Sequence, residues 1–347
     1  MREPSWPFLL ELVRRRYPDT AELDPSPMKG GASTRRFFRI SVGKGGTRAV
    51  AMFTPGAPSH EIHKDGGHAR SPFLEVRGLL AERGIRVPTL FADGSEQGWL
   101  VVEDLGDDTI ANYLVKYPAQ KRDVYRKAVR DLADAQERLR ELPEACIVKS
   151  RAFDHDLLRW ELDHFIEWGV LARGIALSAS DRVAFEAIAG RLATRIADWP
   201  RGFVHRDYQS RNLMVIPGQR DGFELAWIDF QDALLGPRVY DLVALLSDSY
   251  QEFDPGFIEE RLDEYAETAG LDAAERRVLG RQFDWVTVQR KLKDAGRFIF
   301  IDRTHHNPSF LPFVEPTIAK ARAALSRLSG DPDMRALGEL LNRVLGP

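Results

Sequence analysis

Short apolar runs bounded by turn residues dominate the N-terminal part of the chain. Runs of this length and spacing are typical of β-strands. They lie at residues 37–42, 48–53, 87–91 and 99–102. One helix is expected before them, because Phe8 to Val13 places apolar side chains on one helical face. A second helix is expected between them, where Ser71-Pro72 opens a helical pattern that ends at Gly84.

Apolar residues at helical spacing dominate the rest of the chain. The helix-length patterns lie at residues 124–142, 153–168, 180–199, 242–250, 257–269, 273–300 and 316–328. They are interrupted at 202–228, where three short apolar runs alternate with a polar loop and a turn. The pattern therefore predicts an α+β protein. A small antiparallel sheet with a helix is expected in residues 1–104, and a mainly helical part in residues 105–347.

Composition narrows the class of protein. The chain has 347 residues, 44% of them hydrophobic, and a formal charge of −3, so neither nucleic acid nor a membrane is expected as a partner. The apolar run near the N-terminus is too short for a signal peptide or a membrane span. Cys146 is the only cysteine, which excludes an intrachain disulfide and a cysteine-based zinc site. We therefore expect a cytoplasmic protein.

The polar loop within residues 202–228 carries the residues with the clearest chemistry. It contains H-x-D-x-x-x-x-N, formed by His205, Asp207 and Asn212, and the third apolar run ends at Asp229. Phosphoryl transfer from a nucleotide needs a carboxylate that orients the acceptor hydroxyl and accepts its proton, and oxygen ligands for Mg²⁺. Asp207 suits the first role, and Asn212 and Asp229 suit the second. Two surface loops with incidental acids are the alternative, but the joint spacing favours a kinase.

These motifs resemble those of the aminoglycoside phosphotransferase family of kinase-like enzymes. The segment Gly236 to Leu242 looks like the family's following motif, in which a helix acid, here Asp241, braces the catalytic loop. Residues 203–250 are most similar to the anomeric kinases of N-acetylmuramate and N-acetylglucosamine, and the resemblance covers residues 30–302. It implies a two-lobed protein-kinase-like fold with a nucleotide-binding N-lobe, a catalytic and substrate-binding C-lobe, and nucleotide between them.

The resemblance also implies an activity. We expect an ATP- and Mg²⁺-dependent kinase that phosphorylates an amino sugar at its anomeric hydroxyl, in the recycling of cell-wall sugars. The alternatives are a choline, homoserine or aminoglycoside kinase of the same family, and a pseudokinase that binds nucleotide without turnover. Retention of Asp207, Asn212 and Asp229 argues against the pseudokinase. The catalytic segment also supplies residues expected to contact substrate or to support the site: His205, Arg211, Asp232 and Asp241.

Two segments of the N-terminal part are expected at the nucleotide. A loop of small residues over the phosphates is expected before the first strand, with a solvated turn as the alternative. It is formed by Gly30, Gly31, Ser33, Thr34, Arg35 and Arg36. An interlobe hinge that binds the adenine edge is expected at Glu103 and Leu105. Gly43 to Thr47 is expected to be a hairpin turn, because it lacks the G-x-x-x-x-G-K-[ST] spacing of a phosphate loop.

One expected residue is missing. Kinases place a lysine on the third strand, where it binds the nucleotide phosphates and pairs with a helix glutamate. Here that position holds Met52 or Phe53, and Glu75 is the candidate helix acid. We expect Arg35 or Arg36 to substitute, because a guanidinium binds phosphate oxygens in bidentate fashion. The alternatives are that both arginines are solvated, that Mg²⁺ and loop amides suffice without a cationic side chain, or that the protein is catalytically dead.

Three further stretches have two interpretations each. His60, His63 and His68 are conceivable metal ligands, but a loop without that role is favoured. Residues 153–168 combine acids with aromatic rings that suit a sugar, whereas a buried aromatic stripe with a solvated acidic face is commoner. The basic stretch from Gln289 to Arg297 suits an acidic substrate or a phosphate, whereas a solvated helix face is commoner.

Overall fold

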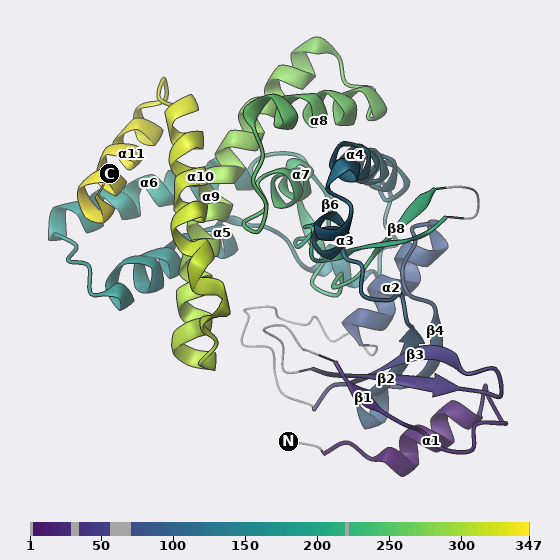
Figure 1. Cartoon of the computed structure of the whole chain (residues 1–347). Helices are drawn as coiled ribbons and strands as arrows, with labels where there is room; N and C mark the ends of the chain where they lie inside the picture. The colour runs from purple at the N-terminus through teal and green to yellow at the C-terminus, as the bar shows by residue number, and fades with distance from the viewer. Residues whose placement is uncertain (1–2, 29–34, 56–70, 219–221, 347) are drawn as a thin grey trace. The chain divides into compact units, whose positions relative to one another are not determined.

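The computed structural model describes residues 3–28, 35–55, 71–218 and 222–346. The chain divides into two compact units (Figure 1). The first consists of Met1–Asp108 with Met214–Ile228, and the second of Thr109–Leu213 with Asp229–Pro347. The sequence predicts that a nucleotide-binding lobe ends at residue 104 and a catalytic lobe follows. This boundary stays a prediction, because the two units are defined by contacts and not by function.

The first unit is built on a five-stranded antiparallel sheet, which confirms the predicted small sheet. The strand order is β1-β2-β3-β5-β4. The strands are β1 (Ser26–Pro27), β2 (Arg36–Val42), β3 (Thr47–Phe53), β4 (Leu90–Gly94) and β5 (Trp99–Glu103). Helix α1 (Trp6–Arg14) packs Leu9, Leu12 and Val13 against one face of the sheet, where Trp99 is fully buried.

The turn between β2 and β3 is the predicted hairpin. Val42 pairs with Thr47, and the Gly46 N–H donates to the Gly43 carbonyl at 3.2 Å. Both glycines have positive φ, at 68° and 61°, a region that costs glycine no steric strain. The same register places Arg36 opposite Phe53, at the sheet position where the strand lysine was expected.

Helix α2 (Pro72–Glu82) begins after Ser71 and ends before Gly84, as the sequence predicts. Its apolar side is buried through Val76, Leu79 and Leu80. Met52 and Phe53 on β3 are also buried, and Phe53 packs on Trp99 with ring centroids 4.8 Å apart. The apolar residues that replace the lysine therefore belong to the core of this unit.

The second unit is mainly helical, which confirms the predicted fold class. Its helices are α3 (Ile110–Lys116), α4 (Lys121–Arg138), α5 (His155–His164), α6 (Ala179–Ala197), α7 (Val239–Leu246), α8 (Pro255–Thr268), α9 (Ala273–His305), α10 (Val314–Arg327) and α11 (Pro332–Leu345). A π-helical turn, Phe165–Val170, continues α5, and a 3₁₀ segment, Pro308–Phe313, follows α9. Helices α3 and α11, the strand β1 of the first unit and the strand β9 described next were not predicted.

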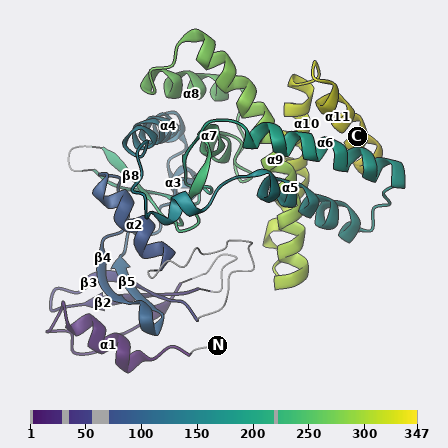
Figure 2. The same cartoon turned by 180° about the vertical axis from the view of Figure 1, so that it is seen from behind.

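Helix α9 is the central element of the second unit. It has 33 residues and begins with a capping box formed by Asp272 and Glu275. Helices α5, α7, α8 and α10 all contact it, as the two opposite views show (Figures 1 and 2). In the described residues no helix has the length and apolar character needed to cross a bilayer.

Short strands frame the candidate catalytic loop. Strand β6 (Arg201–Val204) pairs with β9 (Leu234–Pro237), and β7 (Leu213–Pro217) pairs with β8 (Phe223–Trp227). The three apolar runs predicted around the polar loop are thus β6, β7 and β8. The loop itself, residues 205–212, joins β6 to β7.

Candidate active site

The loop between β6 and β7 is tied to the second unit at several points. The Asn212 side-chain Nδ2 donates to the Asp207 carbonyl at 2.9 Å, so the predicted base and the predicted metal ligand of this loop are in direct contact. The fully buried Tyr208 donates its hydroxyl to the Ala128 carbonyl on α4, also at 2.9 Å. The Ala111 N–H donates to the Ser210 carbonyl. The loop therefore has one arrangement set by surrounding helices.

Two buried carboxylates, one at each end of the loop, accept backbone N–H groups. Asp241 on α7 accepts from His205 at 2.7 Å and from Arg206 at 3.0 Å. Asp248, just after α7, accepts from Ser210 at 2.9 Å. Both carboxylates are 0% exposed. The contacts of Asp241 support its predicted bracing role, whereas the sequence did not single out Asp248.

Burial affects the ionisation of the bracing carboxylate. It raises the pKa of Asp241 to about 7, although the backbone hydrogen bonds from His205 and Arg206 and the charge of Arg290 oppose the shift. The His205 ring is itself fully buried beside Tyr208, with ring centroids 5.8 Å apart. His205 therefore lies in the core beneath the loop, which supports a structural role.

Arg206 in the loop and Asp229 after β8 have left-handed backbone conformations. Arg206 has φ of 78° and Asp229 has φ of 63°. Such conformations cost non-glycine residues of order 1–3 kcal/mol, and they persist where surrounding contacts impose them. The buried Arg206 side chain is held by Glu161 on α5, with Nη2 to Oε1 at 3.3 Å. Glu161 is 0% exposed, so the predicted solvated acidic face of this helix is wrong at Glu161.

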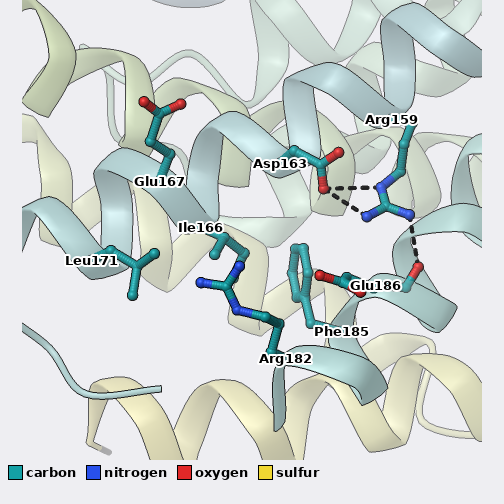
Figure 3. Close-up of a pocket in the computed structure, with 8 residues that line it drawn as sticks. All are labelled: Arg159, Asp163, Ile166, Glu167, Leu171, Arg182, Phe185 and Glu186. Carbon is teal, nitrogen blue, oxygen red and sulfur yellow. Dashed lines mark hydrogen bonds and ion pairs between the residues drawn. The ribbon is translucent and has the colours of Figure 1, made fainter. Parts of the chain in front are cut away.

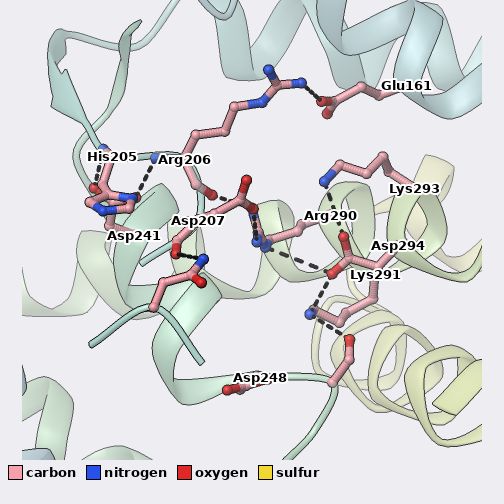
Figure 4. A network of polar contacts seen from close by, with 12 residues as sticks. Glu161, His205, Arg206, Asp207, Asp241, Asp248, Arg290, Lys291, Lys293 and Asp294 are labelled. Atoms are coloured by element: carbon pink, nitrogen blue, oxygen red, sulfur yellow. Dashed lines mark hydrogen bonds and ion pairs between the residues drawn. The ribbon is translucent and has the colours of Figure 1, made fainter. Parts of the chain in front are cut away.

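Asp207 is paired with an arginine from α9. Arg290 donates Nη2 to the Asp207 Oδ1 at 3.0 Å and Nη1 to the Arg206 carbonyl at 2.6 Å (Figure 4). Burial acts to raise the pKa of Asp207, but the charges of Arg290, Lys293 and Arg206 outweigh it and lower this pKa to about 2. The carboxylate is therefore ionised at neutral pH, and its side chain is 35% exposed.

The rest of the basic stretch surrounds a second acid on α9. Asp294 accepts from Lys291 at 2.8 Å and from Lys293 at 3.1 Å. Arg290 and Lys291 are each 1% exposed, so the expected solvated face is wrong for this part of α9. Burial lowers the pKa of Lys291 to about 8, against the charge of Asp294. Arg290 is buried against the candidate catalytic loop, and Lys291 is buried against Ser249, which follows α7.

The predicted metal ligands present oxygen atoms. Because Nδ2 of Asn212 is engaged by the Asp207 carbonyl, its Oδ1 is the atom left to bind a cation. Asp229 is exposed, and Gln231 Nε2 donates to its Oδ1 and to Asp232 Oδ2, each at 2.9 Å. Among the described residues, no three or more His, Cys, Asp or Glu side chains gather into a metal site. Amide and carboxylate oxygens suit Mg²⁺, which proteins often hold together with nucleotide phosphates.

Arg211 has an aromatic environment. Its guanidinium lies 3.5 Å from the Tyr250 ring centroid and 5.4 Å from that of Phe313. Cation–π contacts of this kind contribute about 0.5–2 kcal/mol. The side chain of Arg211, next to Asn212, is thus held by a ring that follows α7 and a ring that follows α9, which supports a structural role for Arg211.

The residues predicted at the nucleotide are only partly described. Gly30, Gly31, Ser33 and Thr34 lie outside the described residues, as do the three histidines of residues 60–68. Arg36 is half-exposed and lies 3.6 Å from a carboxylate oxygen of Glu3. Arg35 directly precedes β2.

The hinge residues have different surroundings. The Glu103 carboxylate is held by Arg86, at 2.9 and 2.5 Å, and by the Thr89 N–H at 3.0 Å. Leu105 is half-buried just after β5. The neighbouring Asp104 has a buried side chain that Arg39 and Arg48 contact at 2.7 and 2.9 Å. The side chain of Glu103 is therefore committed to its own unit, and its backbone N–H donates to the Thr89 carbonyl at 2.9 Å. The adenine contact at Glu103 and Leu105 stays a prediction.

A pocket of about 340 Å³ lies on the side of α5 that faces away from Glu161 and the catalytic loop (Figure 3). It is lined by Arg159, Asp163, Ile166, Glu167, Leu171, Arg182, Phe185 and Glu186. Arg159 and Asp163 are bonded to each other at 2.7 Å, and they lie roughly opposite Glu161 around the helix. The pocket is therefore separate from the loop that carries Asp207.

The fold defines the class of protein. A small antiparallel sheet joined to a mainly helical unit, with a strand-bounded H-x-D-x-x-x-x-N loop, is the architecture of kinase-like phosphotransferases. A sequence profile of the phosphotransferase enzyme family matches residues 24–278. The chain therefore belongs to this family.

Particular relatives share much of the sequence. The N-acetylmuramate/N-acetylglucosamine kinase of Pseudomonas aeruginosa is 32% identical over 324 residues, which cover 91% of this chain and 87% of the relative. The enzyme of the same name from Neisseria meningitidis is 31% identical over 291 residues, covering 81% and 79%.

Solved structures share the fold. A microcompartment-associated aminopropanol kinase matches with a TM-score of 0.62 at 16% identity, covering 93% of this chain and 98% of that one. The streptomycin–ATP–APH(2″)-IIa ternary complex matches with a TM-score of 0.58 at 13% identity, covering 92% and 97%.

Proposed function

We propose that this protein transfers the γ-phosphoryl group of ATP to an amino sugar, with N-acetylmuramate and N-acetylglucosamine as acceptors and the anomeric oxygen as the site of phosphorylation. The names of its relatives, at 31–32% identity over most of the chain, support the acceptor. The observation that carries the chemistry is the ionised Asp207 on a braced loop, in contact with Asn212.

Asp207 acts as the base in this proposal. Arg290 holds one carboxylate oxygen, Oδ1, so the second oxygen is the one that receives the acceptor hydroxyl. The side chain is about one-third exposed, which gives a small molecule access to it. A positioned base of this kind contributes typically about 10²–10⁴-fold to the rate.

Asn212 and Asp229 hold Mg²⁺ in this proposal. The bound cation supplies charge neutralisation for the nucleotide phosphates. Asn212 offers Oδ1, because its Nδ2 is fixed by the Asp207 carbonyl. Gln231 orients the Asp229 carboxylate through Oδ1. Two protein ligands suffice for Mg²⁺ when phosphates and water complete its shell.

Nucleotide recognition is assigned to the first unit. Solved proteins of the same fold include complexes with ATP, ADP and GDP. Arg36 supports the idea of a substitute cation, because it pairs across the sheet with Phe53, where the lysine was expected. Residues 30–34 complete the proposed phosphate-binding loop.

The experiment is turnover of Mg-ATP against a matched panel of acceptors. The panel contains N-acetylmuramate, N-acetylglucosamine, the methyl glycoside of N-acetylglucosamine, choline and an aminoglycoside. We expect turnover with the two free sugars and none with the methyl glycoside, whose anomeric oxygen is blocked. Phosphorus NMR should show phosphate coupled to the anomeric proton.

Other outcomes would replace the proposal. Phosphate on another sugar carbon, or turnover only with choline or the aminoglycoside, contradicts the assigned acceptor. ATP binding without turnover on any acceptor favours the pseudokinase, which the buried Met52 and Phe53 would then explain.

A further inference from the structure

Helix α9 carries a row of cationic and aromatic side chains whose first member, Arg290, contacts Asp207 of the loop. Arg290, Lys293, Arg297 and Phe300 follow one another at spacings of three and four residues, which places them along one side of a helix. Arg290 is bonded to the Asp207 carboxylate. With a rise of about 1.5 Å per residue, Arg297 lies about 10 Å farther along the axis. The row therefore leads away from the proposed base.

Lys293 lies in this row between Arg290 and Arg297. Its charge is among those that lower the pKa of Asp207, and its ammonium group is bonded to Asp294 at 3.1 Å. Its side chain is 14% exposed, and it lies in the same network as Glu161 and Arg290 (Figure 4). A substrate bound at Asp207 is thus next to a second cation of α9.

Aromatic rings form a wall beside the far end of the row. Helix α5 and its π-helical turn pack closely on α9 at Gly296, where an added Cβ would lie 2.9 Å from the His164 carbonyl oxygen. Trp168 contacts Phe300 edge to face at 5.1 Å, and Trp160 stacks on His164 at 5.4 Å. Trp160, Trp168 and Phe300 are each half-buried.

Arg297 lies at this wall. Its guanidinium is 4.8 Å from the centroid of Phe300 and is half-buried. A guanidinium stacked on a ring keeps its five N–H donors in the plane, where they can bind a carboxylate in bidentate fashion. The far end of the row therefore combines a sugar-sized apolar surface with an anion-binding group.

We propose that Lys293, Arg297 and the wall of Trp160, Trp168 and Phe300 form an acceptor subsite that binds the carboxylate of an acidic sugar. This inference rests on the proposed function and specifies its acceptor. N-acetylmuramate carries a lactyl carboxylate, and N-acetylglucosamine is the same sugar without it. The two sugars therefore report on the subsite separately from the chemistry at Asp207.

The test compares the two sugars in Arg297→Met and Arg297→Lys variants. In the methionine variant, the ratio of kcat/KM for N-acetylmuramate to that for N-acetylglucosamine should fall about 10- to 100-fold, the effect of losing a charged hydrogen bond. The lysine variant keeps the charge without the bidentate fork, so its ratio should lie between wild type and Arg297→Met.

Arg303→Met is the matched control. It removes the same charge from α9, but Arg303 is 60% exposed near the end of the helix and lies 3.8 Å from a carboxylate oxygen of Asp302. Its ratio should equal that of the wild type. An unchanged ratio in Arg297→Met overturns the subsite, whether both sugars keep their kcat/KM or lose it equally.

Calorimetric binding separates failure of the subsite from failure of the kinase proposal. If the wild type turns over neither sugar but binds N-acetylmuramate in an Arg297-dependent manner, the kinase proposal falls and the subsite stands. If the wild type binds neither sugar, both are wrong.

Discussion

Replacement of Arg290 tests whether α9 positions the base. Arg290→Met keeps much of the side chain's length and apolar character but removes every donor. The guanidinium is 2% exposed, bonds Asp207 and the Arg206 carbonyl, and lies 4.9 Å from the Tyr240 ring. Loss of one partner of a buried ion pair costs about 3–5 kcal/mol. Because Asp207 is one-third exposed and water can replace part of the interaction, we expect a loss of about 2–4 kcal/mol in unfolding free energy.

The catalytic effect should exceed that of a general loss of stability. A base displaced by about 1 Å can lose roughly 10²-fold in rate, so we expect kcat to fall about 10- to 100-fold with the KM for ATP nearly unchanged. If Arg290 acts through the carboxylate, its replacement should have little further effect in an Asp207→Asn background, where the base is already missing. Urea unfolding and sensitive product detection by mass spectrometry measure both quantities.

Arg261→Met is the matched control for removing a buried arginine. Arg261 is 1% exposed and is bonded to Glu264 on its own helix, at 2.5 and 2.8 Å. Its loss should lower stability but leave kcat within about twofold of wild type in the folded protein. An equal fold-loss from Arg290→Met with and without Asp207, or an unchanged kcat, would refute the positioning argument.

The remaining predictions concern the loop, the metal and the nucleotide. Asp207→Asn should lower kcat about 10²–10⁴-fold with ATP affinity nearly unchanged, and near-normal turnover would rule out the base role. Asp229→Ala should abolish Mg²⁺-dependent turnover and weaken Mg-ATP binding by calorimetry, whereas unchanged binding would make Asp229 a structural acid. Asp248→Asn should cost about 2–3 kcal/mol of stability and lower kcat, because a buried N–H of the loop loses its charged acceptor; Asp254→Ala, which removes an exposed helix cap, should lower stability by about 1 kcal/mol and spare kcat. Arg36→Ala should raise the KM for ATP sharply and leave the acceptor KM unchanged, and parent-like kinetics would exclude Arg36 as the substitute cation.

Local sequence patterns were sufficient for most elements. The apolar runs predicted β2, β3 and β5, and helical spacing predicted α2, α4 and α9, because both patterns repeat over residues that are neighbours in the chain. The hairpin between β2 and β3 followed from its glycines. Strand β9 was missed because Leu234 to Pro237 is short. Its strand partner, β6, lies about 30 residues earlier in the sequence, so no local pattern marks the pair.

The sequence alone therefore determined the fold class, the family and the motif residues of the candidate site, since their spacing lies within one loop and its flanking strands. Only the tertiary structure decided what surrounds them. The Arg290–Asp207 pair spans 83 residues, and the Ser210–Asp248 hydrogen bond spans 38. A basic run on a helix has the same local pattern whether it faces solvent or a buried carboxylate. Its burial on α9 depends on the packing of that helix against the loop, which no local periodicity specifies.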